Sequence, residues 1–238
     1  MFILCSFSDA SFFLLFLSLF ENKKYSILNE FLNDKEFVIL KCDKCEFLWQ
    51  KYQPLNDLAT ILYDTIIDEK QSFNKSEIVF LKKGEKFKKE FNYIIKYFNS
   101  EKIRVLDFGA GWGSWLKSID KNKIKSYALE ISISRKKYLT SQNIEVLDLK
   151  QVKDYVNYFN YIKLEQVLEH STDLKSCMEL LKKIVNKNSI IDVAVPFGKK
   201  QFSKSKNIKI EKGPIQPLEH VNCFTNKSLK RLFSNYGF

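Results

Sequence analysis

The segment from Ile103 to Gly113 constrains the fold more than any other part of this chain. An apolar run, Ile103–Leu106, leads to an acid, and three glycines then follow at every second position. The run is typical of a buried parallel strand. Gly109, Gly111 and Gly113 permit positive φ angles and bring backbone N–H groups against a ligand. We expect a tight turn and then a helix, beginning near the third glycine, whose positive end faces a nucleotide-like ligand.

The position of the third glycine separates two classes of cofactor. The dinucleotide fingerprint is G-x-G-x-x-G, and Ser114 occupies its last position in this chain. The pattern here, a hydrophobic strand, an acid and G-x-G-x-G, resembles motif I of the class I S-adenosylmethionine-dependent methyltransferases. A nicotinamide-dependent oxidoreductase, NAD(P)-linked, is the alternative that Ser114 disfavours.

Further blocks extend this resemblance from about residue 100 to the last residue. Strands are predicted over Lys125–Leu129, Ile144–Leu147, Tyr158–Leu164 and Ser189–Val195. Alternation of these strands with helices predicts an α/β fold, with a Rossmann-like, doubly wound, mainly parallel sheet. The block Val167-Leu168-Glu169-His170 resembles one found after the fourth strand in a small-molecule subgroup of the family. The C-terminal pattern "E-H…F-T…S-L…G-F", from Glu219 to Phe238, resembles the same subgroup.

The resemblance also implies roles for the residues that follow the strands. Glu130 would accept hydrogen bonds from both ribose hydroxyls. An acid at Asp148 would face the adenine amino group, Leu149 would pack on the ring, and Glu165 would contact the methionine portion. The full set of cofactor contacts implied in this way is Asp107, Gly109, Ala110, Gly111, Gly113, Glu130, Ile131, Asp148, Leu149, Glu165 and Gln166. One departure is Asn160, where the family usually has Asp, so a role that needs an anion there is in doubt.

The chain contains two histidines, His170 and His220, and each follows a Leu-Glu pair. By resemblance both lie on loops at the carboxyl edge of the sheet, and histidine exchanges protons near neutral pH. His170 is our first candidate for a general base, followed by His220, with Glu169 as a catalytic partner. The alternative is that they only hold the loop, because methyl transfer can depend on positioning alone. The three could also bind a divalent metal, but their spacing does not predict a metal site.

The formal net charge of +11 raises the question of nucleic-acid binding. Only Arg104, Arg135 and Arg231 are arginine, so lysine carries nearly all of the positive charge. Abundant Lys, Asn, Ile and Phe indicate a general compositional bias, which we favour over an RNA-binding surface. Trp112 and Trp115 are interpreted as packing residues beside the glycine turn.

Residues 1–55 are predicted to form a small N-terminal module. Cys42 and Cys45 have zinc-knuckle spacing within a hairpin-like stretch, Phe37–Trp49, which resembles the zinc-ribbon module of some family members. Ser8 stands where a second cysteine would follow Cys5, so we favour a degenerate, metal-free hairpin. The apolar run Phe12–Phe20 is too short to span a bilayer, and a buried element is favoured over a membrane-associated one. Unpaired cysteines and the lack of an export signal predict a cytoplasmic protein.

Residues 56–100 are predicted to form a helical cap or linker that Gly84 interrupts, and residues 101–238 the methyltransferase domain. Gly198–Pro217 is expected to form a loop or lid. The family's final β-hairpin is missing after Phe238, so we expect a C-terminally truncated domain. The expected function is methyl transfer from S-adenosyl-L-methionine to an O, C or N atom of a sugar, sugar nucleotide or quinone-like acceptor. A non-catalytic, cofactor-binding or scaffold module of a biosynthetic assembly is the other alternative.

Overall fold

The computed structural model describes residues 10–13, 38–54, 68–100, 102–198, 216 and 219–238. The chain divides into two compact units. Ile67–Val167 and Glu179–Ala194 form the first, called here the parallel-sheet unit; Met1–Ile66, Leu168–Met178 and Val195–Phe238 form the second, the antiparallel-sheet unit. The boundaries predicted at residues 55 and 100 do not coincide with this division.

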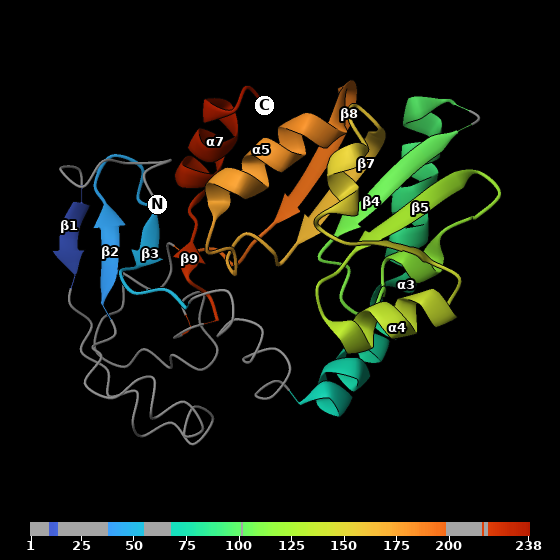
Figure 1. The fold of residues 1–238 in the computed structure, drawn as a ribbon, viewed down its shortest axis with the longest axis horizontal. Helices are drawn as coiled ribbons and strands as arrows, with labels where there is room; N and C mark the ends of the chain where they lie inside the picture. The colour runs from blue at the N-terminus through green and yellow to red at the C-terminus, as the bar shows by residue number, and fades with distance from the viewer. Residues whose placement is uncertain (1–9, 14–37, 55–67, 101, 199–215, 217–218) are drawn as a thin grey trace. The chain divides into compact units, whose positions relative to one another are not determined.

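Five parallel strands form the sheet of the first unit, in the order β6-β5-β4-β7-β8 (Figure 1). They are β4 (Ile103–Phe108), β5 (Ile124–Leu129), β6 (Glu145–Leu147), β7 (Phe159–Glu165) and β8 (Val185–Ala194). All five strands were predicted, and the fold is the expected Rossmann-like α/β arrangement. β8 begins earlier than the predicted Ser189, because a register shift lets Asn186 and Ser189 donate side-chain hydrogen bonds to the carbonyl of Phe159.

The helix α3 (Glu69–Phe98) runs without a break through Gly84, so the predicted interruption is wrong. Asp68 caps its first turn by accepting a hydrogen bond from the amide of Gln71, at 2.8 Å. It ends at Asn99, which adopts the left-handed conformation that favours helix termination. A single glycine costs only about 1 kcal/mol in a helix, which tertiary packing can offset.

Packing of α3 on one face of the parallel sheet builds the core of this unit. Its buried residues Phe87, Phe91 and Ile94 join strand residues of β4, β5 and β7 and Leu139 of α4 (Ile133–Ser141) in one cluster. The remaining members are Ile103, Val105, Trp115, Leu116, Ile124, Ala128, Ile144 and Tyr161. Side chains on β4 alternate between faces, so Ile103, Val105 and Asp107 share the face that α3 covers. The acid of the glycine motif therefore lies on the side of the sheet that α3 covers.

Asn160, the departure from the family pattern, lies near the start of β7 and ties that strand to β4. Its Oδ1 accepts hydrogen bonds from the backbone amide of Arg104, at 2.9 Å, and from Arg104 Nε, at 3.4 Å. An amide oxygen is sufficient for this role, because both groups of Arg104 donate hydrogen bonds to one acceptor atom. Asn160 is therefore explained by strand packing.

The antiparallel-sheet unit contains a four-stranded sheet in the order β1-β2-β3-β9. These strands are β1 (Ala10–Phe13), β2 (Ile39–Cys42), β3 (Leu48–Gln50) and β9 (Asn222–Cys223). β2 and β3 confirm the predicted hairpin. Within the C-terminal pattern, α7 (Asn226–Asn235) begins with a capping box between Thr225 and Ser228. α5 (Leu174–Ile184) contains residues of both units.

The cysteines differ from the prediction that all are unpaired. Cys42 is disulfide-bonded, whereas Cys45, Cys177 and Cys223 are not in disulfides. A cysteine in a disulfide cannot serve as a thiolate ligand, so the zinc-knuckle pair is not available in this state. Most of Phe12–Phe20 and of the predicted lid Gly198–Pro217 lies outside the described residues, as do residues 56–67 of the predicted helical cap. Among the helices that are described, none has the length and apolar character needed to cross a bilayer.

Candidate functional site

The glycine turn lies directly after β4, at the carboxyl edge of the parallel sheet. All three glycines have positive φ angles, of 77° at Gly109, 56° at Gly111 and 71° at Gly113. A Cβ atom on Gly109 would lie 2.7 Å from Val167 Cγ2, and one on Gly113 would lie 2.6 Å from Leu139 Cδ2. A Cβ on Gly111 would meet no protein atom within 4 Å. Two glycines are therefore required by packing, and Gly111 leaves its backbone approachable from outside the protein.

The turn differs from the prediction in its hydrogen bonds and in the element after it. The amides of Gly109 and Ala110 donate to the carbonyl of Leu129, at 2.8 and 3.1 Å, and the amide of Gly113 donates to Ala110. These N–H groups are engaged within the protein and do not point at a ligand. The helix expected near the third glycine is also wrong: only a short 3-10 helix, Leu116–Ser118, comes after the turn. A helix dipole therefore does not explain ligand binding here.

Glu130, at the end of β5, is the carboxylate that the structure holds most firmly. Its Oε2 accepts a hydrogen bond from the amide of Gly111, at 2.8 Å, and its Oε1 accepts from Ile131 and Ser132, at 2.7 and 2.9 Å. The side chain is only 5% exposed. Arg135 lies 3.9 Å away and adds a favourable charge. Each carboxylate oxygen has two lone-pair directions, so Oε2 can still accept a hydrogen bond from a ligand hydroxyl.

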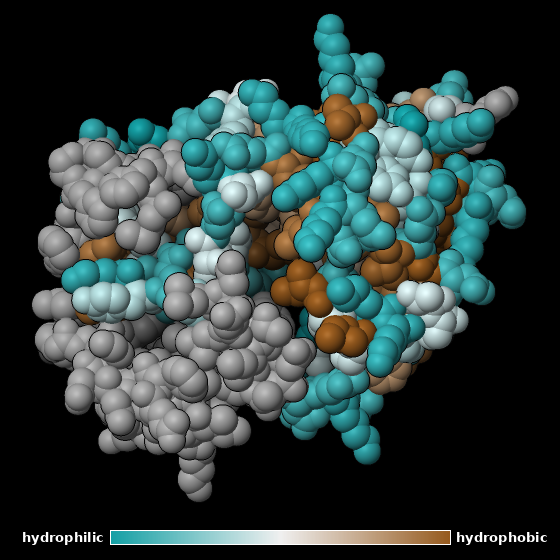
Figure 2. Space-filling model, viewed as in Figure 1, coloured by the Kyte–Doolittle hydropathy of each residue, from teal (hydrophilic) through white to brown (hydrophobic). Residues whose placement is uncertain are grey.

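Two apolar side chains, Ile131 and Leu149, are exposed at the same edge of the sheet, by 56% and 47%. Figure 2 shows hydrophobic residues exposed among hydrophilic ones in the region of α4. Asp148, after β6, accepts hydrogen bonds from the amides of Lys150 and Gln151, which lower the pKa of its carboxyl. Exposed aliphatic side chains beside fixed polar groups are suited to hold a flat, partly polar ring.

Asp107 precedes the glycine turn and is buried. Burial raises the pKa of its carboxyl to about 7, and the positive charge of Lys163 offsets part of this rise. Nearby carboxylates, Glu165 first among them, raise the pKa further. Asp107 is therefore poised to be protonated or ionised close to neutral pH.

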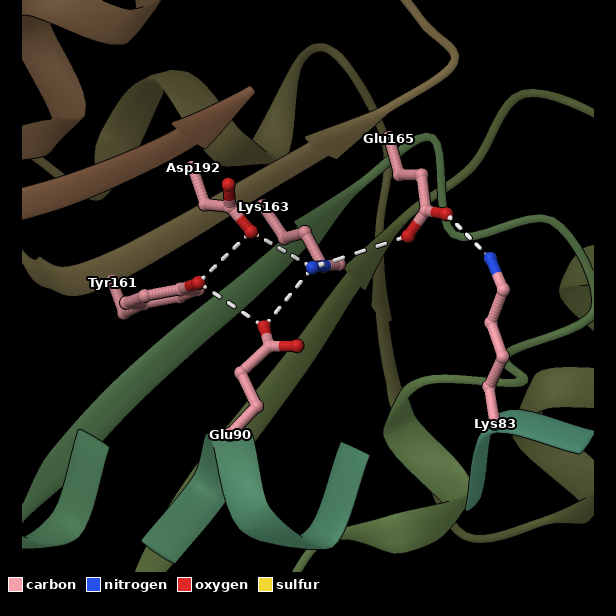
Figure 3. Close-up of polar contacts among 6 residues, drawn as sticks. All are labelled: Lys83, Glu90, Tyr161, Lys163, Glu165 and Asp192. Atoms are coloured by element: carbon pink, nitrogen blue, oxygen red, sulfur yellow. Dashed lines mark hydrogen bonds and ion pairs between the residues drawn. The ribbon is translucent and has the colours of Figure 1, made fainter. Parts of the chain in front are cut away.

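A buried lysine organises the polar residues on the α3 side of β7 (Figure 3). Lys163 Nζ lies 2.8 Å from Asp192 Oδ2 and 3.0 Å from Glu90 Oε1, and the hydroxyl of Tyr161 donates to the same two carboxylates. Burial opposes the charge of Lys163, but the bonds to Asp192 and Glu90 outweigh it and raise its pKa. The network joins β7, β8 and α3, and a fully paired cluster of this kind fixes their relative positions.

Glu165 continues this network toward the carboxyl edge of the sheet. Its Oε2 lies 3.9 Å from Lys163 Nζ and its Oε1 lies 3.5 Å from Lys83 Nζ of α3 (Figure 3). The two lysines offset its charge, which reduces what Glu165 can offer to a cationic ligand group. The next residue, Gln166, has a φ of 59° and donates its amide to the carbonyl of Ala194. Such strain in a non-glycine residue often accompanies functional sites.

The predicted catalytic residues lie together in the antiparallel-sheet unit. One possible ligand atom from each of Glu169, His170 and His220 lies within 4.8 Å of the others. The rings of His170 and His220 are 4.7 Å apart and nearly perpendicular. Glu169 is 1% exposed, and burial raises the pKa of its carboxyl to about 7. The sequence thus predicted a set of residues that the fold does bring together.

A family model described as a methyltransferase domain matches residues 80–238, which is more than half of the chain. The chain belongs to the methyltransferase-domain family. Membership confirms the resemblance drawn from the glycine motif and disagrees with the oxidoreductase alternative. No curated protein matched this chain.

Solved structures of methyltransferases resemble this chain in fold. An S-adenosylmethionine-dependent methyltransferase from Leishmania major is 15% identical, with a TM-score of 0.54, over 76% of this chain and 72% of its own. One from Archaeoglobus fulgidus is 20% identical, with a TM-score of 0.48, over 65% and 69%. A Methanococcus maripaludis protein assigned to the same class is 17% identical, with a TM-score of 0.44, over 53% of this chain and 63% of its own. The chain therefore spans less than two thirds of the length of the Methanococcus maripaludis protein.

The residues described above fit the adenosyl group of S-adenosylmethionine. Gly111 leaves backbone accessible where a Cβ atom would otherwise project. Glu130 presents a fixed carboxylate that suits ribose hydroxyls, and Ile131 and Leu149 present apolar surface that suits adenine.

The contacts of α3 with the glycine turn were not predicted from the sequence. Ser72 accepts a hydrogen bond from Trp112 Nε1, at 3.1 Å, and the hydroxyl of Ser114 donates to the carbonyl of Ser76, at 3.0 Å. Ser114, which distinguished two cofactor classes by its position, is thus also a contact to α3. Trp112 and Trp115 are 7% and 3% exposed, as expected of packing residues. The signal for α3 was its helical periodicity, which does not indicate which loop a polar face will contact.

Proposed function

We propose that this chain transfers a methyl group from S-adenosylmethionine to an oxygen, nitrogen or carbon atom of a small-molecule acceptor. The observation that carries the proposal is the arrangement after β4, β5 and β6. An open backbone at Gly111, a fixed carboxylate at Glu130 and exposed apolar side chains at Ile131 and Leu149 come after three neighbouring parallel strands. Ligands of open α/β sheets bind outside the carboxyl ends of the strands.

When bound, the cofactor supplies a methyl group on a positively charged sulfur, which is a strong electrophile. The protein's own task is to orient the acceptor and to exclude water. In our proposal Glu130 holds the ribose and Asp148 and Leu149 hold the adenine. Asp107, Gly109, Ala110, Gly113, Glu165 and Gln166 complete the walls of the site.

The acceptor's proton is the second part of the proposal. His170 Nδ1 lies 2.8 Å from the carbonyl oxygen of Glu219. A carbonyl only accepts, so Nδ1 carries the proton and Nε2 keeps its lone pair. His170 is therefore in the tautomer that a general base requires, with His220 and Glu169 beside it. A sugar, sugar nucleotide or quinone-like acceptor, with a hydroxyl to deprotonate, is the class we propose.

Binding of the product cofactor, S-adenosylhomocysteine, tests the first part by calorimetry. Glu130→Gln should weaken binding by about 10- to 100-fold, because a hydrogen bond to a charged group contributes about 1.5–3 kcal/mol. Glu85→Gln, an exposed carboxylate on α3, is the matched control and should bind as the unmodified chain does. Equal affinities for all three proteins, with unchanged unfolding curves, would contradict the proposed cofactor site.

A further inference from the structure

Glu169, His170 and His220 have the composition of a metal site. Two imidazoles and one carboxylate offer nitrogen and oxygen ligand atoms that all lie within 4.8 Å of one another. The distance from Glu169 Oε1 to His170 Nε2 is 4.0 Å. Bonds of ~2.0–2.1 Å to a tetrahedral metal place ligand atoms ~3.4 Å apart. Movements of the ligand atoms by about an ångström, through side-chain rotation, would therefore bring all three to bonding distance.

The burial of Glu169 also points to a bound ligand. Its side chain is 1% exposed, and neither carboxylate oxygen accepts a hydrogen bond from any residue that the structure describes. A buried carboxylate without such bonds costs several kcal/mol as an anion. A cation beside it would remove that cost, and the ring nitrogens of His170 and His220 lie within 4.8 Å of its carboxylate.

The two segments that carry these side chains are held in place by hydrogen bonds. Asn222 donates its backbone amide to the carbonyl of Glu169, at 3.0 Å, and its side-chain amide to the carbonyls of Leu168 and Ser171, at 2.9 and 2.6 Å. Gln50 donates to the carbonyl of His220, at 3.0 Å. The Nδ1–H bond of His170 to a backbone carbonyl is the outer contact that metal-bound histidines usually make. The cluster is therefore preorganised.

We propose that Glu169, His170 and His220 bind a divalent first-row transition metal, with Zn²⁺ as the representative ion. Two nitrogen ligands and one oxygen suit zinc and its neighbours better than Mg²⁺ or Ca²⁺, which take oxygen ligands. Three protein ligands leave at least one coordination position open. His170 is 26% exposed, so that position can be reached by water or by a hydroxyl of another molecule.

The metal site is independent of the proposed cofactor site, because all three ligands belong to the antiparallel-sheet unit. With a metal bound, His170 would not act as a direct base, since Nε2 cannot bind a metal and a proton together. A hydroxyl on the metal would instead lose its proton because of the positive charge.

Titration of the full-length, chelator-treated chain with Co²⁺ tests the site by visible absorption. We expect one equivalent to bind with the bands of a four- or five-coordinate ion, Zn²⁺ to displace it, and millimolar Mg²⁺ to leave it in place. Glu169→Gln and His220→Gln should each weaken Co²⁺ binding by at least about 100-fold, because loss of outer-shell contacts alone costs 10- to 100-fold. Asp173→Asn, an exposed carboxylate in the same segment, is the matched control.

Several outcomes would overturn the metal site. These are no stoichiometric Co²⁺ binding, equal weakening by Asp173→Asn and Glu169→Gln, or a thiolate-to-cobalt charge-transfer band, which would place the ion on a cysteine such as Cys45. Circular dichroism without metal checks that each variant is folded. If Glu169→Gln does not fold, His220→Gln, at a half-buried position, still tests the site. The variants should bind S-adenosylhomocysteine with the affinity of the unmodified chain. Failure of the metal site is therefore distinguishable from failure of the proposed function.

Discussion

At Gly113 the packing and the backbone act in the same direction. A Cβ atom would lie 2.6 Å from Leu139 Cδ2, and the φ angle of 71° already disfavours a side chain. Gly113→Ala should therefore lower the free energy of unfolding by about 2–4 kcal/mol, from backbone strain of about 1 kcal/mol and overpacking of about 1–3 kcal/mol. Urea unfolding measures this loss.

Gly111→Ala is the matched comparison, because a Cβ there meets no protein atom within 4 Å. It should lower the free energy of unfolding by only about 1 kcal/mol, from its backbone alone, and should weaken S-adenosylhomocysteine binding more than stability. If Gly113→Ala were as stable as Gly111→Ala, the close packing of the turn on α4 would be contradicted.

Asp107 makes stability depend on pH. Its pKa is about 7 in the folded chain and about 3.9 when unfolded, so the folded state binds more protons between these values. The free energy of unfolding should therefore fall as pH rises from about 4 to about 7, by up to about 4 kcal/mol. Asp107→Asn should remove the share of this fall that Asp107 causes and leave the share from Glu169, whose pKa is also raised to about 7, as urea unfolding at pH 4.5 and 7.5 would measure. The exposed Asp120→Asn is the control, and parallel pH profiles for both variants would contradict the raised pKa.

Among the elements, α3 continues through a glycine that was expected from the sequence to interrupt it. A Cβ on Gly84 would meet only Phe80 Cε2, at 3.8 Å, which is ordinary van der Waals contact. Gly84→Ala should raise the free energy of unfolding by about 0.5–1 kcal/mol, because alanine loses less backbone entropy in a helix. Thermal melting checks this, and a destabilised variant would contradict an unbroken helix at this position.

The strand β7 shows what periodicity could and could not predict. Its apolar residues predicted a buried strand correctly, but nothing local indicated that Lys163 would be buried within it. Its partners, Glu90 and Asp192, come from α3 and β8, so the network exists only once the sheet and the helix are assembled. Local patterns report on local structure, whereas the burial of a charge depends on distant partners.

For the whole molecule, the sequence predicted all five strands of the parallel sheet and the family, because apolar runs and the glycine turn are local signals. Which residues make up the antiparallel-sheet unit could not be predicted. It joins three separated stretches of chain, and its sheet pairs Leu48 and Trp49 with Cys223 and Asn222. The disulfide at Cys42 removes one of the two grounds for the cytoplasmic location, which stays a prediction.

The pairing of β3 with β9 has a consequence for biosynthesis. β3 ends at Gln50, and its partner strand emerges from the ribosome roughly 170 residues later. At 5–20 residues per second that interval lasts about 10–35 s. During that time β3 presents an unpaired edge, with the buried residues Leu48 and Trp49 on it. A nascent chain of this protein thus carries a strand edge of the kind that chaperones shield from association.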